Sequence, residues 1–367
     1  MLTSCAGLVS TLADTRQNDL TGRERTWALS ERPGLDWRPG LAGVAGWLCC
    51  ARDREMPAGQ RERRLAAVQQ HLTPSVAATR TCAGHGSSSG SSAVATTIVD
   101  VRAAPASADG RPASDWGGIQ GLGQICVAVE TADGRIGFGV GGGGQPGLDV
   151  IALALRPLLV GRDRADVEAL WEAMYKHTLA YGRKGLTIMA ISGVDLALWD
   201  LRAKAAGVSV AELLGASTAA LSQPVPSYRT APNDLAAAVA EGYTKVKLSI
   251  GGMDVVTQPD EIIATVQRAR EELGGDVELM IDATMKWSDR EAVLRLCERL
   301  ARLDLAVAYL EEPLPSDDLE GYAWLTSRSP IPIAGGEHEQ TAAGFAELMG
   351  ARNRTLLCLR QQLFVVS

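Results

Sequence analysis

The chain has 367 residues, of which 46% are hydrophobic and 22% are charged, and its formal net charge is −7 at pH 7. This composition is typical of a soluble globular protein of two domains, and the acidic balance argues against a nucleic-acid partner. No apolar run reaches the roughly 18 residues that a membrane-spanning helix needs, so we expect no membrane partner. Seven cysteines without a CxxC pair, and a start without a basic segment, favour reduced thiols in the cytoplasm.

Residues 1–95 differ from the rest of the chain. They contain arginine but no lysine, they end in a glycine- and serine-rich run, and only Arg61–Leu72 has the apolar spacing of a helix. We interpret this region as a poorly ordered or non-native extension, for example one translated from a misassigned start.

From residue 96 the pattern becomes regular and predicts an α+β capping domain over residues 96–222. Strands are expected at 97–101, 125–131 and 136–139, and helices at 149–159, 165–179 and 188–206. The glycine-rich run Gly139–Gly144 is followed neither by the lysine of a phosphate-binding loop nor by a βαβ unit. We therefore interpret this run as a flexible loop.

After residue 223 the predicted strands and helices alternate, which is typical of a parallel α/β barrel. Strands are expected at 225–229, 244–249, 277–283, 307–312, 331–337 and 355–359, with helices that include 260–273 and 289–303. Because eight strands close such a barrel, six predict a partial barrel over 223–367 that lacks its last strands. The chain would then be a frameshifted fragment, or the remaining strands would come from elsewhere.

Three carboxylates stand at the ends of three successive predicted strands. They are Asp282, Glu311 and Glu337, and the spacings of 29 and 26 residues each equal about one strand plus one helix. The C-terminal ends of parallel barrel strands meet at one mouth, so we expect these side chains to converge. Converging carboxylates need a cation, and Mg²⁺ prefers oxygen ligands. The alternative is that surface carboxylates end these strands by chance, which three regular repeats disfavour.

Two lysines precede these carboxylates. Lys245 and Lys247 share a face of one predicted strand, because residues i and i+2 point the same way, and Lys247 stands 35 residues before Asp282. A divalent cation and a second ammonium nearby would disfavour the charged form of Lys247, lower its pKa toward neutrality and let it act as a base. The alternative is a solvated lysine that closes a strand.

With these motifs, residues 96–350 resemble the enolase superfamily, in its mandelate racemase and muconate lactonizing subgroup, and most closely its sugar-acid dehydratases. The resemblance also rests on Tyr181–Gly185 and Ile191–Asp200. It implies a capping domain in front of a TIM-like barrel. It further implies Lys247 as the acid/base and Lys245 as an electrostatic helper.

The resemblance assigns Mg²⁺ to Asp282, Glu311 and Glu337. In Glu311-Glu312-Pro313 it is the first glutamate that would bind the ion, and Glu312 would point the other way because strand side chains alternate. The same alternation puts His338 on the face opposite Glu337, so that a packing role and a substrate-contacting or supporting role both stay open.

The implied chemistry is Mg²⁺-dependent removal of the proton α to a carboxylate, with dehydration of a sugar acid to a 2-keto-3-deoxy acid as the expected reaction. Return of the proton on the other face would give racemisation, so a racemase or epimerase of the same superfamily is an alternative. Tyr181–Gly185 and Gly336–Glu339 favour the dehydratase branch. An inactive truncated homologue is a further alternative, because residues 352–362 lack the aspartate that relatives carry there. The complete protein is expected to form a homo-oligomer.

Overall fold

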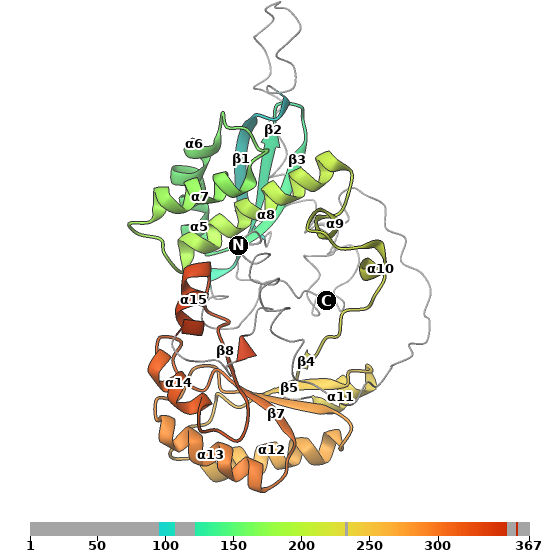
Figure 1. The fold of residues 1–367 in the computed structure, drawn as a ribbon, viewed down its shortest axis with the longest axis vertical. Coiled ribbons are helices and arrows are strands. Elements are labelled where there is room, and N and C mark those ends of the chain that lie inside the picture. Colours follow the sequence, from blue (N-terminus) through green and yellow to red (C-terminus); the bar gives the residue numbers. More distant parts are fainter. Residues whose placement is uncertain (1–94, 107–121, 232–233, 351–356, 359–367) are drawn as a thin grey trace, which may run out of the picture. The chain divides into compact units, whose positions relative to one another are not determined.

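The computed structural model describes residues 95–106, 122–231, 234–350 and 357–358 (Figure 1). The described residues up to Ser222 form one compact unit, and those from Gln223 onward form a second. The expected extension, with its helix at Arg61–Leu72, lies outside the described residues apart from residue 95. In the part of the chain that is described, no helix is long and apolar enough to cross a membrane.

The first unit pairs a three-stranded antiparallel sheet with helices on one face. The strands follow chain order: β1 (Ile98–Pro105), β2 (Gln124–Thr131) and β3 (Ile136–Gly142). The helical segments are α5 (Gly144–Val150), the π-helical turn η4 (Ile151–Leu155), α6 (Arg156–Leu159), α7 (Val167–Thr178), α8 (Leu186–Ala206), α9 (Val210–Leu213) and α10 (Thr218–Leu221). Alternate residues of β2, namely Ile125, Val127 and Val129, pack against η4, α7 and α8, so the predicted α+β order is observed.

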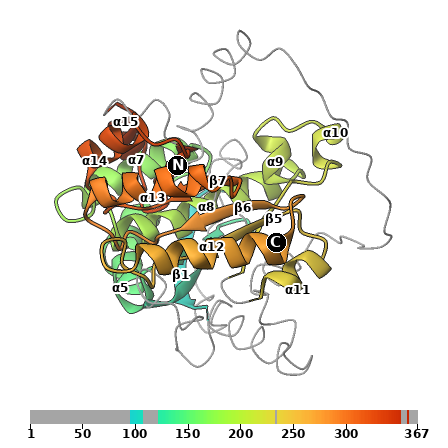
Figure 2. The ribbon, with the colours of Figure 1, turned by 90° about the horizontal axis from the view of Figure 1, so that it is seen from below.

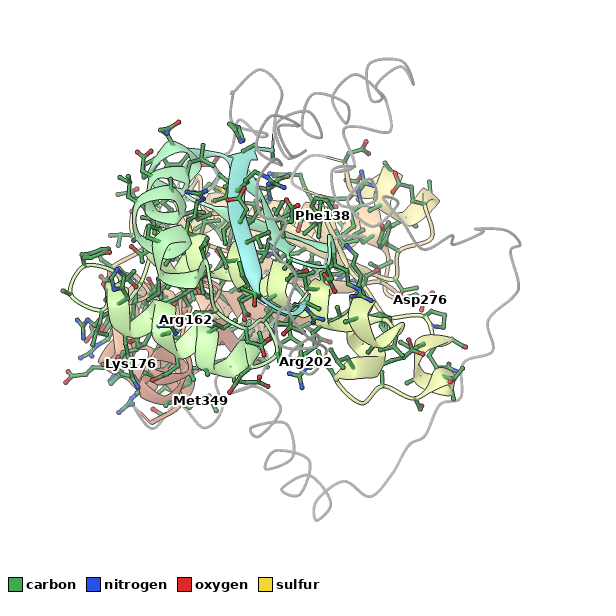
Figure 3. All side chains as sticks on the ribbon, turned by 90° about the horizontal axis from the view of Figure 1, so that it is seen from above. Phe138, Arg162, Lys176, Arg202, Asp276 and Met349 are labelled. Atoms are coloured by element: carbon green, nitrogen blue, oxygen red, sulfur yellow. The ribbon has the colours of Figure 1, made fainter. Side chains whose placement is uncertain are left out.

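The glycine-rich run is not a flexible loop, which corrects the interpretation from sequence. Gly139–Gly142 belong to β3, and Gly144 begins α5. A Cβ on Gly139 would collide with the carbonyl oxygen of Gly193, and one on Gly137 with that of Ala197, both in α8. Glycine at alternate positions therefore lets α8 pack directly on the strand backbone. Arg202 of α8 is labelled in Figure 3. Its guanidinium lies 3.3 Å from the carboxylate of Glu168, so this ion pair joins α8 to α7.

The second unit is a parallel α/β sheet whose strands lie in chain order. They are β4 (Arg229–Thr230), β5 (Lys245–Ser249), β6 (Glu278–Asp282), β7 (Val307–Glu311), β8 (Ile333–Gly335) and β9 (Leu357–Cys358). The helices are α11 (Leu235–Ala240), α12 (Pro259–Leu273), α13 (Arg290–Arg302), α14 (Leu319–Thr326) and α15 (Ala342–Gly350). Each of the six strand stretches expected from sequence overlaps one of these strands. That the barrel lacks its last strands stays a prediction.

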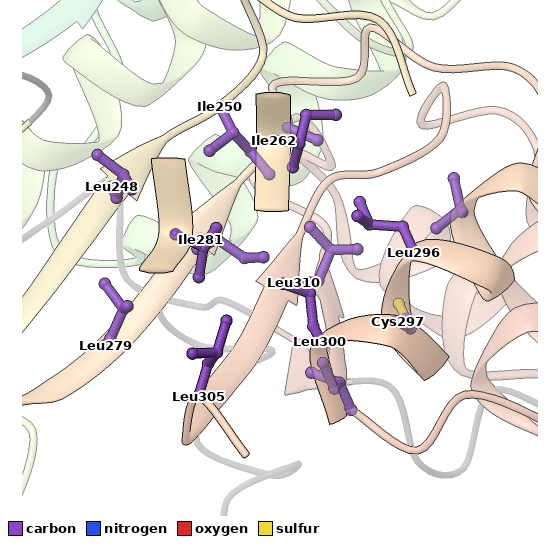
Figure 4. Close-up of a cluster of buried hydrophobic side chains, with 14 of the residues drawn as sticks. Leu248, Ile250, Ile262, Leu279, Ile281, Leu296, Cys297, Leu300, Leu305 and Leu310 are labelled. Carbon is purple, nitrogen blue, oxygen red and sulfur yellow. The ribbon is translucent and has the colours of Figure 1, made fainter. Parts of the chain in front are cut away.

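Strand alternation divides the two faces of this sheet by chemistry. Helices α12 and α13 lie along one face of the sheet (Figure 2). Val246, Leu248, Leu279, Ile281 and Leu310 pack with residues of these helices such as Ile262, Leu296 and Leu300 (Figure 4). The residues that alternate with them along the strands, including Lys247, Asp282 and Glu311, therefore point to the other face. Burial of the apolar face fixes the register of the strands, and the register in turn fixes where the charged side chains stand.

Candidate active site

The C-terminal ends of three neighbouring strands bring a lysine and two carboxylates together. Asp282 and Glu311 are the last residues of β6 and β7 and are partners in the parallel register. The Lys247 Nζ atom, from β5, lies 2.8 Å from Glu311 Oε2 and 3.1 Å from Asp282 Oδ2. Lys247 is 2% exposed and Glu311 is fully buried. Two of the three predicted metal ligands and the predicted base thus meet in a buried cluster.

Without a divalent cation, the charged neighbours of Lys247 are the two carboxylates expected beside it. Burial favours the neutral amine, but the nearby carboxylates of Asp282 and Glu311 outweigh it and raise the pKa of Lys247 above its ordinary value. Lys245 does not join this cluster, because its Nζ lies 3.1 Å from Glu278 Oε2 at the other end of the strands. The second ammonium is thus not part of this cluster, and a lowering of the Lys247 pKa beside a divalent cation stays a prediction.

The pKa of Glu311 is also shifted by this arrangement of buried charges. Burial raises its pKa to about 7; the Lys247 ammonium opposes the rise, and the charge of Asp282 adds to it. The Tyr228 ring closes the cluster on the β4 side, with its centroid 5.5 Å from Lys247 Nζ. Among the described residues, two carboxylates thus lie against one buried ammonium, an arrangement that a further cation would stabilise.

Asp282 also organises the loop that follows it. Its Oδ1 accepts a hydrogen bond from the backbone N–H of Thr284 at 2.8 Å, while its Oδ2 faces Lys247. Thr284 and Met285 both have positive φ angles, 51° and 59°. Thr284 thus contacts Asp282 through its backbone.

Glu337, the third predicted ligand, is not grouped with the other two. Its Oε1 lies 3.0 Å from His338 Nε2. Although Glu337 is largely buried, His338 lowers the pKa of Glu337, and Glu337 in turn raises the pKa of His338. Within the described ranges, no three His, Cys, Asp or Glu side chains form a group that could hold a metal ion. The charge of Glu337 nonetheless reaches Glu311, whose pKa it helps to raise.

The expectation that His338 faces away from Glu337 is wrong. It assumed that strand alternation continues through residue 338, whereas β8 ends at Gly335. Gly336 then takes a φ of 100°, and the chain turns, so that the two side chains meet.

The expectation that Glu312 points away from Glu311 is confirmed. Glu312 is fully buried on the opposite side of the chain, where its Oε2 accepts a hydrogen bond from the Tyr322 hydroxyl at 2.8 Å. Its Oε1 accepts from the backbone N–H groups of Gly336 and Glu337, at 2.7 and 3.2 Å. Sequence reasoning gave Glu312 no role. A signal for its role was present in the sequence. Strand alternation turns Glu312 toward the apolar face, and a carboxylate buried there needs a hydrogen-bond partner.

Comparisons with known proteins place this arrangement in a family. The model of the family "Enolase C-terminal domain-like" matches residues 232–359. The model of the family "Mandelate racemase / muconate lactonizing enzyme, N-terminal domain" matches residues 116–215. The L-rhamnonate dehydratase of Saccharopolyspora erythraea is 37% identical over 235 residues, which cover 63% of this chain and 59% of that protein. The chain thus spans about three fifths of the length of this curated relative.

Solved structures agree. The crystal structure of L-rhamnonate dehydratase from Gibberella zeae matches with a TM-score of 0.61 and 30% identity, over 70% of this chain and 69% of that one. L-Talarate dehydratase from Polaromonas sp. JS666, complexed with Mg and L-glucarate, matches with a TM-score of 0.57 and 31% identity, over 70% of each chain. The chain therefore belongs to the enolase superfamily, in the mandelate racemase and muconate lactonizing group, whose fold is a capping domain followed by a TIM-like barrel.

Proposed function

We propose that this protein removes the proton α to the carboxylate of a sugar acid with the help of Mg²⁺, and that it dehydrates the substrate to a 2-keto-3-deoxy acid. The observation that carries the proposal is the buried cluster of Lys247, Asp282 and Glu311 at the C-terminal ends of parallel strands. That is the end of the sheet where barrel enzymes place their chemistry. The names of the relatives support a sugar acid as the substrate, since they are dehydratases of rhamnonate and talarate.

The donor set suits Mg²⁺, which prefers carboxylate oxygens. Asp282 and Glu311 already converge on one cation, the Lys247 ammonium. Asp282, Glu311 and Glu337 would hold the ion, with Glu337 completing the set from the segment after β8. When bound, the ion would supply positive charge for the substrate carboxylate and for the negative charge that develops on it.

Lys247 would move the proton. Its Nζ, as the neutral amine, takes the proton from the carbon next to the substrate carboxylate and becomes the ammonium. The Lys247 ammonium then returns this proton to the β-hydroxyl, whose C–O bond breaks as it leaves as water, and the resulting enol converts to the 2-keto acid. Contacts with Asp282 and Glu311 fix the direction of the Lys247 side chain, and burial excludes water from it. Lys245, on the same face, would add positive charge from a greater distance.

Thermal unfolding of the full chain with and without Mg²⁺ tests the metal site. A ligand that binds only the native state stabilises it by about 2.7 kcal/mol at 100 times its Kd, so Mg²⁺ should raise the Tm. The triple variant Asp282→Asn, Glu311→Gln, Glu337→Gln should lose this rise. Glu278→Gln, which alters a half-exposed carboxylate on the same strand as Asp282, is the matched control and should keep it. An equal rise in the wild type and the triple variant would contradict the assignment.

Exchange of the substrate α-proton in D₂O tests Lys247. Across a panel of aldonic and aldaric acids, Lys247→Ala should abolish the exchange and the formation of 2-keto acid, while the Mg²⁺-dependent rise in Tm persists. Exchange at the wild-type rate in this variant would remove Lys247 from the mechanism. Exchange in the wild type with inversion of the α-carbon and no keto acid would favour a racemase or epimerase instead.

A further inference from the structure

Glu312 is a buried carboxylate that the proposed chemistry does not use. It is the residue directly after β7, it is fully buried, and its φ angle is +43°. A positive φ is costly for a residue with a side chain, so the surroundings must hold it in place.

The backbone of Glu312 joins the ends of two neighbouring strands to its own. Its N–H donates a hydrogen bond to the carbonyl of Ala334 in β8, at 2.9 Å. Its carbonyl accepts one from the N–H of Met285, in the loop after Asp282, at 2.7 Å. The segments that carry Asp282 and Glu311 and the strand that leads to Glu337 therefore meet at this one residue.

The side chain of Glu312 anchors the turn that carries Glu337. Oε1 accepts from the N–H groups of Gly336 and Glu337, which follow β8 and have left the ladder of strand hydrogen bonds. Without this acceptor, the Gly336 N–H would be left buried and unpaired, which would destabilise the turn. On the far side, Tyr322 of α14 lies 2.8 Å from both Glu312 Oε2 and the carbonyl of Leu314. Tyr322, almost fully buried, thereby fixes the carboxyl group in orientation.

We propose that Glu312 is a positioning residue: through its hydrogen bonds to the backbone of Gly336 and Glu337 it sets the direction in which the Glu337 side chain leaves the sheet. The inference rests on the proposed function in one respect, that Glu337 is a metal ligand. Groups that orient metal ligands commonly change metal affinity 10–100-fold when they are removed. Glu312 acts from the side opposite the ion and touches neither substrate nor metal.

Four variants of the full chain separate positioning from general stability. Glu312→Met fills the space but offers no acceptor to Gly336 and Glu337. Glu312→Gln keeps the Oε1 acceptor and offers an N–H to the Tyr322 oxygen, whose own hydrogen then goes to Leu314. Glu312→Asp is one methylene shorter and serves if the methionine variant does not fold. Tyr322→Phe removes the partner of Oε2 but leaves both backbone bonds of Oε1.

The first readout is amide hydrogen exchange of Gly336 and Glu337 in Mg²⁺-free protein, which does not depend on the metal. We expect at least about tenfold faster exchange at both amides in Glu312→Met and, to a smaller degree, in Glu312→Asp. Wild-type protection is expected in Glu312→Gln, and near wild-type protection in Tyr322→Phe. Unchanged protection in Glu312→Met, or equal loss in Tyr322→Phe, would overturn the inference.

The second readout is Mg²⁺ affinity by calorimetry. We expect a 10–100-fold loss in Glu312→Met and a change below about threefold in Glu312→Gln and Tyr322→Phe. A wild-type affinity in Glu312→Met would overturn the link to the ligand even if exchange increases. If the wild type itself binds no Mg²⁺, the proposed function fails. Glu312 is then judged by the exchange experiment alone, where lost protection in Glu312→Met still supports its hold on Glu337.

Discussion

The two ends of the parallel strands in the second unit hold charge in opposite ways, with a half-buried cation at one end and a buried cluster at the other. At the N-terminal end, a single guanidinium, that of Arg270 in α12, donates hydrogen bonds to four backbone carbonyls in the segments that lead into β6 and β7: Gly274, Val277, Leu305 and Ala306. All of these acceptors are neutral. At the C-terminal end, a single ammonium, that of Lys247, faces two carboxylates with a third nearby.

The difference shows what each end is built for. The bonds of Arg270 satisfy carbonyls that no strand pairing reaches, and no like charges compete for them, so this end contributes stability. At the C-terminal end, burial and the charge of Asp282 raise the pKa of Glu311, so that the ionised form of this carboxyl group costs stability. Sites that bind or react commonly give up stability in this manner. Four substitutions sharpen or break the comparison.

Lys247→Met should have the largest effect. It leaves Asp282 and Glu311 buried without their shared ammonium, and removal of one partner from a buried ion pair typically costs about 3–5 kcal/mol. Because Mg²⁺ would replace the missing positive charge, the variant should recover a larger part of its stability from Mg²⁺ than the wild type gains. Urea unfolding with and without Mg²⁺ measures both quantities. A loss below about 1 kcal/mol in Mg²⁺-free buffer would show that this end is not under charge strain.

Arg270→Met should cost somewhat less and respond differently. Loss of several charge-assisted hydrogen bonds to carbonyls is expected to lower the free energy of unfolding by about 2–3 kcal/mol. The gain on adding Mg²⁺ should equal that of the wild type, since the substitution lies at the other end of the strands. Arg268→Met is the matched control, because Arg268 is an exposed residue of the same helix that bonds only to Thr265 among the hydrogen bonds described. Reduced Mg²⁺ stabilisation in Arg270→Met would mean that the two ends are coupled.

Much of the C-terminal end could be predicted from sequence because two short-range rules determine it. Period-2 alternation separates Lys247 from the apolar residues around it, and it separates Glu311 from Glu312. The repeat of strand plus helix then brings Asp282 beside Glu311. These rules need only the spacing of residues along the chain.

Contacts between distant segments, and the side-chain directions that turns produce, could not be predicted from the sequence. The alternating glycines of β3 are needed because α8 packs directly on the strand backbone. Since α8 is distant in sequence, the local pattern of this strand indicates a loop. His338 meets Glu337 only because Gly336 turns the chain. The hydrogen bond from Tyr322 to Glu312 joins two elements whose approach no local pattern specifies. The direction of a pKa shift likewise depends on the combined effect of charged neighbours from several segments.

Gly336→Ala changes the C-terminal end of the strands and should moderately lower both the stability and the response to Mg²⁺. Its φ of 100° suits glycine, and a Cβ would lie 3.0 Å from a methyl carbon of Leu348. The strain is expected to cost about 1–3 kcal/mol. Because the turn carries Glu337, the Mg²⁺-dependent rise in Tm should also shrink. Gly252→Ala, at a glycine with open space around it, is the control and should leave both quantities near wild type. A stability loss in Gly336→Ala with the full Mg²⁺ response would separate the turn from the metal site.

Lys245→Gln should have the smallest effect, and it isolates burial as the cause of the contrast. Lys245 and Lys247 are the same residue type, two positions apart on one face of β5, but the Lys245 side chain is 41% exposed and that of Lys247 is 2% exposed. The pair of Lys245 with Glu278 is a surface ion pair, which contributes roughly 0–1 kcal/mol and weakens as salt is added. The free energy of unfolding should therefore fall by less than about 1 kcal/mol, by less still at high salt, and the stabilisation by Mg²⁺ should stay at its wild-type value. The double variant with Glu278→Gln should cost no more than the two single variants together. If Lys245→Gln instead costs as much as Lys247→Met, or reduces the Mg²⁺ response, then Lys245 belongs to the charged cluster, and the boundary between the two ends lies lower on β5 than the contacts indicate.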